Sequence, residues 1–298
     1  MPISQRDVRN RIASVKNIEK ITRAMEMVAA ARLRRAEQRI EALRPYASAI
    51  RRMTREAAQA AGLLTRLPIL AEHDQVSSVG LLLVAGDRGL AGGFNSNIVR
   101  AGVAAGREHE GQGRSAVYFA SGRRPASSLR FRGHEPAESF VGFTDRPAYA
   151  DARRIAERLV AAYLDNEVDQ VEVFYNGYIS PIAQVVRHEI LLPLQRASVF
   201  GEGEDESDEE PARAPFEYEP DPEKILERLI PDYVEVSIYR ALLESTASEH
   251  GARMTAMRNA TDNAGEIIED LTLEMNRARQ AEITQEIMEV VAGAEGLG

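Results

Sequence analysis

The chain has 298 residues, and 44% of them are hydrophobic, so it is not a disordered polypeptide. It contains no Cys, which excludes disulfides, thiolate metal sites and thiol redox switches. The net charge is −9, but residues 1–58 hold 14 Arg and Lys against 6 Asp and Glu, a local +8 that leaves −17 for the remainder. This asymmetry indicates a basic segment with a function of its own or one that faces acidic partners.

No membrane span or export signal is visible in the sequence. The longest apolar runs, such as residues 80–86, are far shorter than the roughly 20 residues of a spanning helix. The N-terminus lacks the apolar core of a signal peptide and leads directly into a helical pattern. We therefore expect an intracellular protein.

Residues 1–61 form the first predicted element, a long helix. Ser4 followed by Asp7 resembles a capped start, in which a side-chain oxygen accepts a free backbone N–H. Pro45 should kink this helix or end its first part. Apolar or small residues recur every 3.5 residues on average, the repeat of a helix that winds around a partner. They are Val8, Ile12, Val15, Ile18, Ile21, Met25, Val28, Leu33, Ala36, Ile40 and Leu43.

Residues 76–200 combine strand patterns with helical patterns. Strands are predicted at Ser78–Ala85, Ala116–Ala120, Val171–Tyr175 and Ala183–Leu191. Helices are predicted at Ser96–Glu110, Pro125–Phe131 and Ala148–Asn166. Strands that alternate with helices predict an α/β domain of Rossmann-like βαβ type, in which helices pack on a parallel or mixed sheet.

An acidic, proline-rich segment follows at residues 201–223. It holds eleven Asp and Glu against one Arg, together with four Pro. Because the charges repel and there is little to bury, we expect a surface loop at residues 201–215. We also expect that residues 202–210 are dispensable for function.

Residues 224–298 form the last predicted element, a second long helix. Pro231 and Asp232, followed by Glu235, resemble a capped start. Two helices of similar length and period, joined by one folded domain, predict a long antiparallel coiled coil of the N- and C-terminal helices. The second seam steps by four and three through Leu243, Ala247, His250, Met254, Met257, Thr261, Ala264, Ile268, Leu271, Met275 and Ala278.

Candidate chemical sites are weak. The loop at residues 86–95 lies between a strand and a helix, as a phosphate-binding loop does, but it lacks both the Gly-Lys-Ser/Thr and the Gly-x-Gly-x-x-Gly patterns. We therefore interpret Gly89, Gly92 and Gly93 as residues of a tight structural turn. The five His are scattered, and His250 is expected to pack in the seam. We predict no catalytic, metal-binding or cofactor-binding residue and no cofactor.

Short motifs at both ends of the chain carry a family resemblance. The first helix contains RIASVKN at 11–17, KIT at 20–22 and AMEMVAA at 24–30. The last contains LES at 243–245, SEH at 248–250, ARM at 252–254, NATDN at 259–263 and NRARQA at 276–281. Together with DRGL at 87–90 and YEPDP at 218–222, these motifs resemble the gamma subunit, or central stalk, of F-type ATP synthases.

This resemblance implies that the chain is a non-catalytic rotary shaft. The coiled coil would stand inside a ring of three alpha and three beta subunits, and the α/β domain would sit with the epsilon subunit on the c-subunit ring. Proton flow would turn the ring and the shaft, which would drive ATP synthesis in the beta subunits. The family is also credited with influencing ATPase activity and proton flow. The protein would be peripheral to the bacterial inner (plasma) membrane, on its cytoplasmic side, and would not bind nucleic acid.

The resemblance also implies three groups of contact residues. The first group, Arg279, Gln280 and Thr284, would touch a beta-subunit loop called the catch. The second group, on the N-terminal helix, would lie beside an acidic segment of beta and comprises Lys16, Lys20, Arg23 and Met25. The third group, in an apolar end that would turn as a bearing, comprises Ile287, Val290 and Val291. Solvated helix faces are the alternative for the first two groups.

Two other functions stay open from the residues alone. The alternating middle region and the glycine loop suit a Rossmann-like enzyme with helical arms, which would bind a nucleotide. The basic N-terminal segment suits a nucleic-acid-binding coiled coil, although the acidic remainder would repel phosphates.

Overall fold

The structure is a computed structural model that describes residues 5–61, 69, 75–181, 183–194 and 222–295. The predicted acidic segment therefore lies almost entirely outside the described residues. Contacts divide the chain into two compact units. We call Met1–Ala30 with Arg253–Gly298 the coil unit, and Ala31–Ala252 the sheet unit.

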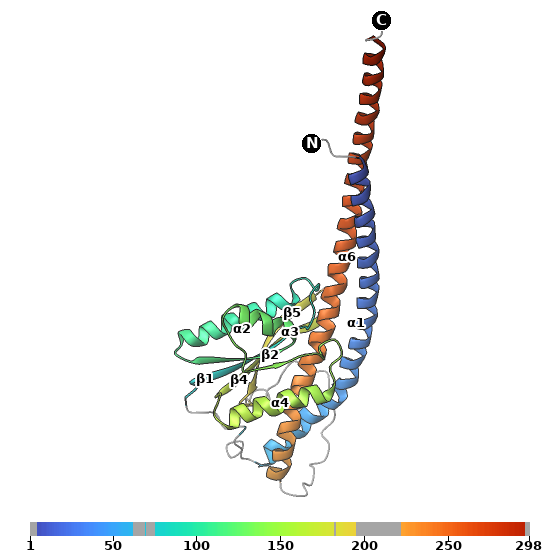
Figure 1. Ribbon diagram of the computed structural model, residues 1–298. Helices are drawn as coiled ribbons and strands as arrows, with labels where there is room; N and C mark the ends of the chain where they lie inside the picture. Colours follow the sequence, from blue (N-terminus) through green and yellow to red (C-terminus); the bar gives the residue numbers. More distant parts are fainter. Residues whose placement is uncertain (1–4, 62–68, 70–74, 182, 195–221, 296–298) are drawn as a thin grey trace. The chain divides into compact units, whose positions relative to one another are not determined.

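The sheet unit is built on a five-stranded sheet with the order β3-β2-β1-β4-β5 (Figure 1). Neighbouring strands are parallel except β5, which runs antiparallel to β4. The predicted α/β fold is thus confirmed. The strands are β1 (Ser78–Val84), β2 (Ser115–Ser121), β3 (Glu138–Phe140), β4 (Gln170–Ser180) and β5 (Ala183–Leu192).

Helices cover both faces of this sheet (Figure 1). On β1, Leu81 and Leu83 pack against α2 and α3, whereas Leu82 and Val84 pack in the core formed with α4, α1 and α6. A strand buried on both faces needs apolar residues at every position, which is why β1 reads as a continuous apolar run. The three helices that belong to the sheet domain alone are α2 (Phe94–Gly111), α3 (Arg123–Phe131) and α4 (Tyr149–Leu164).

Two long helices begin and end the described chain: α1 (Gln5–Ala61) and α6 (Pro222–Glu295). Pro45 lies inside α1, so the prediction that it could end the first part of this helix is wrong. Pro231 also lies inside its helix, and α6 begins at Pro222 rather than at the predicted start. An internal proline costs about 3 kcal/mol. Burial of Leu226 and Ile230 in the sheet unit's core offsets that cost.

In the coil unit, α1 and α6 pair in antiparallel directions. The hydroxyl oxygens of Thr22 and Thr261 lie 2.7 Å apart, and Arg258 Nε donates to Glu26 Oε1 at 2.9 Å. Residue numbers that rise on one helix therefore meet falling numbers on the other. The predicted α6 seam is confirmed here, because every seam position from Met254 to Ala278 is buried or half-buried.

The predicted seam of α1 is wrong at three positions in the coil unit. Ile18, Ile21 and Val28 are 50%, 58% and 53% exposed. The buried stripe instead runs through Thr22 and Ala29, which are 8% and 1% exposed. The stripe keeps the steps of four and three that a coiled coil requires, even where this places polar residues in it. Ile18, Ile21 and Val28 are apolar neighbours of the stripe and lie outside it.

Two glycines inside α6 should respond to alanine in different ways. Gly265→Ala removes the helix penalty of glycine without a clash, because no heavy atom would lie within 4 Å of the new Cβ. We expect the free energy of unfolding to rise by about 0.5–1 kcal/mol in urea titrations. At Gly251 the same Cβ would lie 2.9 Å from Pro181 O, so Gly251→Ala should gain less or lose stability. Equal gains in both variants would contradict this expectation.

Candidate functional site

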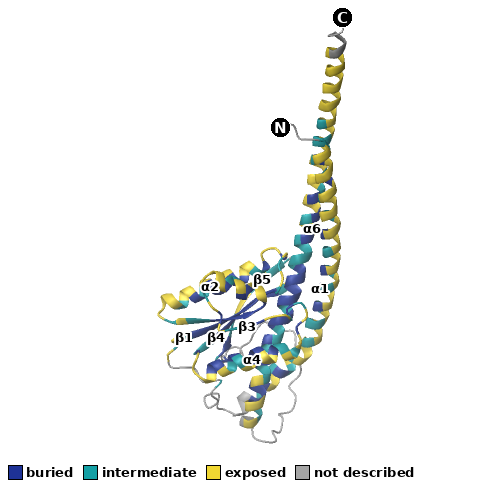
Figure 2. Cartoon of the chain, viewed as in Figure 1, coloured by how far each residue is buried: buried dark blue, intermediate teal, exposed yellow. Residues whose placement is uncertain are grey.

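In the coil unit, α6 continues past the described part of α1. The pairing of Thr22 with Thr261 places Gln5, where the described part of α1 begins, opposite about Ala278. Beyond this position, every residue of α6 through Ala292 is exposed (Figure 2). A single exposed helix gains nothing from tertiary packing, and isolated helices are marginally stable in water.

The predicted catch residues lie at the beginning of this unpaired stretch. Arg279, Gln280 and Thr284 are all exposed. Gln280 and Thr284 are one turn apart on the same face, and Thr284 Oγ1 donates to Gln280 O at 2.8 Å. Within the described chain, Arg279 forms no ion pair, so its planar guanidinium is available to an outside carboxylate.

The predicted apolar end also belongs to this stretch. Ile287, Val290 and Val291 are 58%, 72% and 49% exposed, and Ile283 and Met288 are similarly open. Spacings of three, four and seven place most of these side chains along one side of the helix. A contiguous apolar stripe in water marks an interaction surface.

The predicted N-terminal contact residues do not form one group. Lys16, Lys20 and Arg23 are exposed, whereas Met25 is half-buried. At about 100° per residue, the three basic residues lie within roughly 60° of one another, beside the seam. Met25 lies on the other side of the seam, together with exposed Ile18, Ile21 and Val28. The sequence prediction missed this apolar strip because it assigned these three residues to the seam.

The glycine loop between β1 and α2 is organised by Asn95. Its side chain accepts a hydrogen bond from Gly86 N at 2.8 Å and donates one to Arg88 O at 2.9 Å. Gly92 has φ of 55°, a left-handed conformation that glycine adopts without strain. Gly89 lies beside Arg124, and Gly93 caps the start of α2.

Asp87 binds the neighbouring loops to this turn. Its carboxylate accepts hydrogen bonds from Arg123 N at 3.0 Å, Gly142 N at 2.9 Å and Thr144 Oγ1 at 3.1 Å. Arg123 begins α3 directly after the turn that follows β2, and Gly142 and Thr144 belong to the loop that follows β3. A carboxylate at this position is unfavourable for phosphate, because like charges repel.

A polar segment of α6 covers the place where a doubly wound sheet usually binds its ligand. That place lies at the carboxyl ends of the strands, where the strand order reverses, which is between β1 and β4 here. Ser245 Oγ donates to Val84 O at 3.4 Å, and Ser248 Oγ donates to Asn176 O at 3.0 Å. A Cβ on Gly86 would lie 2.9 Å from the carboxyl group of buried Glu249.

His250 continues this buried segment of α6. It is 1% exposed, as a packed seam residue should be, and its Nε2 lies 3.7 Å from Asp145 Oδ1. The periodicity of the sequence did not reveal that the neighbouring Ser and Glu side chains are buried as well. The only signal for them was their place in the family motifs.

A second polar cluster surrounds Glu172 on β4, which is 2% exposed. Its carboxylate binds His188 Nε2 at 2.8 Å, and His109 Nε2 and Gln170 Nε2 at 3.0 and 2.8 Å. Burial alone would raise the pKa of Glu172, but the hydrogen bonds and charges of the two His hold this pKa below its ordinary value. The hydrogen bond to Glu172 raises the pKa of His188. Among the described residues, no group of three His, Asp or Glu is arranged to hold a metal ion.

This cluster predicts a pH dependence of stability. The contribution of His188 is fully present below its unfolded pKa of about 6.5 and is lost as the pH rises through its higher folded pKa. The contribution of Glu172 is present above about 4.5 and is lost as the pH falls through its lower folded pKa. Between about pH 4.5 and about pH 6.5, His188 and Glu172 therefore both contribute to the stability of the folded state.

His188→Gln should reduce the loss of stability between pH 6 and pH 8.5, as measured by urea unfolding. His134→Gln is the matched control, because the His134 ring packs at a tilt of 49° against Tyr118 and has no hydrogen bond to Glu172. The expectation fails if wild type and His188→Gln lose equal stability over this range.

Comparison with known proteins places these features in a family. A family model described as ATP synthase matches residues 4–297. The ATP synthase gamma chain of Rubrobacter xylanophilus is 46% identical over 294 residues, covering 99% of this chain and 98% of the relative. That of Moorella thermoacetica is 44% identical over 292 residues, covering 98% of each.

Solved structures agree with this placement. A chain from the central stalk and c-ring of the Tetrahymena thermophila mitochondrial ATP synthase is 28% identical, with a TM-score of 0.59, over 80% of this chain and 99% of that one. A chain from the Euglena gracilis mitochondrial enzyme is 16% identical with a TM-score of 0.67, over 98% of this chain and 94% of that one, and supports the fold alone.

A mixed α/β sheet domain, flanked in sequence by two long helices and matched in this way, defines a central-stalk subunit of a rotary ATP synthase. None of the helices that the structure describes is both long and apolar enough to cross a membrane. The chain belongs to the ATP synthase gamma chain family, as its end motifs predict.

Proposed function

We propose that this chain is the rotating shaft that couples proton flow to ATP synthesis. The c-subunit ring would turn the shaft, and its uneven surface would change the conformation of one beta subunit after another. The observation that carries this proposal is the exposed end of α6, which presents a polar face and an apolar stripe with no partner in the described chain. Both surfaces need an outside partner of matching chemistry.

The polar face suits a transient, directional contact. Arg279 would form a paired hydrogen bond with a carboxylate on a beta-subunit loop, with Gln280 and Thr284 beside it. Lys16, Lys20 and Arg23 would meet acidic beta segments, where exposed charges mainly affect encounter and specificity. Such contacts are weak enough to release at each step.

The apolar end suits continuous turning. Ile287, Val290 and Val291 would lie in an apolar sleeve formed by the alpha and beta subunits. Apolar contact has no preferred direction, so rotation would exchange one equivalent contact for another. The apolar strip of Ile18, Ile21 and Val28 on α1 would face the same ring of subunits.

The remaining partners would be epsilon and the c-ring, on the cytoplasmic side of the bacterial inner membrane. Catalysis would belong to the beta subunits and not to this chain. Two observations support this assignment: Asp87 lies in the glycine loop, and α6 covers the usual ligand position of the sheet. We propose no cofactor and no nucleic-acid partner.

The latch role of Arg279 is tested by charge reversal in the assembled enzyme. We expect Arg279→Glu to lower the rate of ATP hydrolysis about tenfold, which corresponds to roughly 1.4 kcal/mol. Arg277→Glu is the matched control, because Arg277 is also exposed but points about 200° away around the helix. Equal effects in the two variants would reject the latch. The shaft itself is rejected if the tagged chain does not co-purify with alpha and beta subunits from membranes.

A further inference from the structure

A short stretch of α6, residues 240–248, is attached to the sheet domain by directional bonds, and these bonds lie within the sheet unit. The hydroxyls of Ser245, Thr246 and Ser248 each lie within hydrogen-bond distance of a backbone carbonyl, at 3.4, 2.9 and 3.0 Å respectively. The Thr246 hydroxyl shares its hydrogen with a carbonyl of its own helix at 2.8 Å. The accepting carbonyls come from the end of β1, the loop after β3 and the middle of β4: Val84, Thr144 and Asn176.

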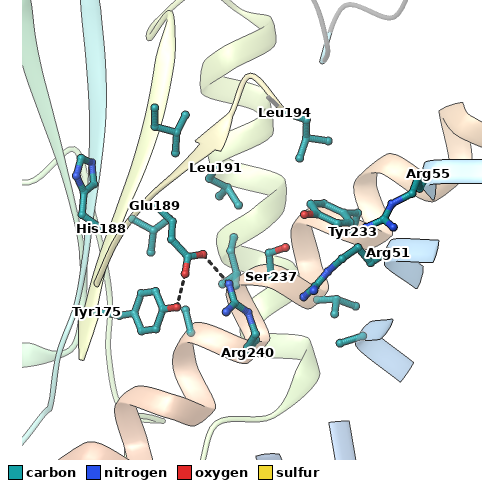
Figure 3. Close-up of a pocket in the computed structure, with 16 residues that line it drawn as sticks. Arg51, Arg55, Tyr175, His188, Glu189, Leu191, Leu194, Tyr233, Ser237 and Arg240 are labelled. Carbon is teal, nitrogen blue, oxygen red and sulfur yellow. Dashed lines mark hydrogen bonds and ion pairs between the residues drawn. The ribbon is translucent and has the colours of Figure 1, made fainter. Parts of the chain in front are cut away.

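Arg240 attaches the same stretch of α6 to β5, the outermost strand of the sheet (Figure 3). Its Nη2 donates to Glu189 Oε2 at 2.6 Å, and its Nη1 lies 3.6 Å from Glu244 Oε1. The Tyr175 hydroxyl of β4 donates to the other oxygen of Glu189 at 2.5 Å. Burial raises the pKa of Tyr175, so this hydroxyl keeps its proton and remains a donor. The carboxylate of Glu189 is therefore fixed by two donors from different elements.

The four attachments lie in different directions around α6. Each residue of an α-helix advances about 100° around the helix axis. With Ser245 placed at 0°, Thr246 lies at about 100°, Arg240 at about 220° and Ser248 at about 300°. The widest gap between neighbouring attachments is about 120°. Rotation of α6 about its own axis, in either direction, would therefore stretch several of these bonds at once.

Apolar packing alone would not resist such a rotation. Leu226, Ile230 and Leu242 of α6 belong to the buried core of the sheet unit. Burial of apolar surface favours contact without preferring one orientation. A hydrogen bond, in contrast, weakens steeply when its angle changes. The three hydroxyls and Arg240 thus add to this core a resistance to sliding and rotation.

We propose that Arg240, Ser245, Thr246 and Ser248 form a torque joint, which fixes the rotational setting of α6 in the sheet domain. They are positioning residues, because they act through α6, the helix that carries Arg279 and the apolar end. This role rests on the proposed shaft function, since only a turning protein places a rotational load on the joint. Directional bonds occur where α6 must not turn against its neighbours, and directionless apolar side chains occur at the end that turns.

The first test measures the joint in the purified full-length chain by amide hydrogen exchange. The double variant Arg240→Met, Ser248→Ala removes two attachments and leaves the apolar core unchanged. Exchange at residues 240–252 should become about tenfold faster, which is the effect of losing on the order of one hydrogen bond. Exchange in α2 should not change. Unchanged exchange at residues 240–252 would overturn the proposal, whether or not the chain assembles with other subunits.

The second test measures coupling in the assembled enzyme in membrane vesicles. The readout is the ratio of protons pumped to ATP hydrolysed, which a smaller amount of folded chain does not change. The double variant should lower this ratio about twofold, because its joint opens about tenfold more often. Arg240→Lys keeps a charged donor for Glu189 and should retain most of the coupling, although it loses the planar fork.

Arg158→Met is the matched control. The Arg158 side chain is 28% exposed against 27% for Arg240, and its ion pairs with Glu138 and Glu167 do not involve α6. This variant should leave the ratio unchanged. An equal loss of coupling in Arg158→Met, or a wild-type ratio in the double variant, would overturn the joint. Failure of the unaltered chain to co-purify with alpha and beta subunits would instead reject the shaft function, and the exchange measurement would still decide whether these bonds hold α6.

Discussion

Gly122→Ala is expected to lower the free energy of unfolding by about 4 kcal/mol. Gly122 begins the turn after β2 with φ of 110°, a conformation that side-chain-bearing residues rarely adopt. A Cβ there would lie 2.4 Å from Ala85 O and 2.9 Å from Gly86 O, both of which are backbone atoms. Two hydrogen bonds oppose a backbone shift that would relieve this clash: Gly122 N donates to Phe140 O at 2.7 Å, and Arg124 N donates to Gly86 O at 3.1 Å.

Gly142→Ala distinguishes the cost of an unfavourable backbone conformation from the cost of a steric clash. Gly142 also has a positive φ, of 95°, but no heavy atom would lie within 4 Å of its new Cβ. We expect a loss of only about 1–2 kcal/mol, which is the conformational cost alone. Urea unfolding of both variants, followed by circular dichroism, gives the comparison. If the two losses are equal, the close approach of the loops after β1 and β2 does not contribute to stability.

Asp87→Ala should have the next largest effect, a loss of about 3 kcal/mol in the free energy of unfolding. The change removes the acceptor for Arg123 N, Gly142 N and the Thr144 hydroxyl at once. Hydrogen bonds to a charged group contribute about 1.5–3 kcal/mol each, but Asp87 is half-exposed, and water replaces part of what is lost. Amide exchange at Arg123 and Gly142 should become faster in the variant.

Asp87→Asn is the matched variant, because it keeps the shape and one acceptor oxygen. It should lose about half as much stability as Asp87→Ala. The same loss in both variants would mean that the charge, and not the geometry of the acceptor, connects the three loops. No loss in either variant would show that solvent satisfies these donors equally well.

Much of the fold could be predicted from the sequence, because it follows from local periodicity. The run Ser78–Ala85 predicts a strand buried on both faces, and β1 occupies nearly that range. The four-three spacing from Met254 to Ala278 predicts the seam of α6 correctly. Both patterns extend over enough residues to distinguish a strand from a helix.

Features that depend on distant partners could not be predicted in this way. Ile18 looks like a seam residue, but its exposure follows from the register set by Thr22 against Thr261. β3 has three residues, which is too short for a period to be detected. Ser248 looks like a solvated helix residue, but its hydroxyl binds Asn176 O from a strand 72 positions earlier. The family motifs marked this segment without explaining it.

The buried segment of α6 prevents this sheet from acquiring a ligand site at the carboxyl ends of its central strands. In relatives of the doubly wound architecture, the gap at the ends of the central strands is the place where new ligands are acquired. Here Ser245, Ser248 and Glu249 occupy that gap from within the same polypeptide. Any variant that opened the gap for a nucleotide would also release α6 from the sheet. Acquiring an enzymatic pocket at this position and keeping these contacts between α6 and the sheet are therefore mutually exclusive.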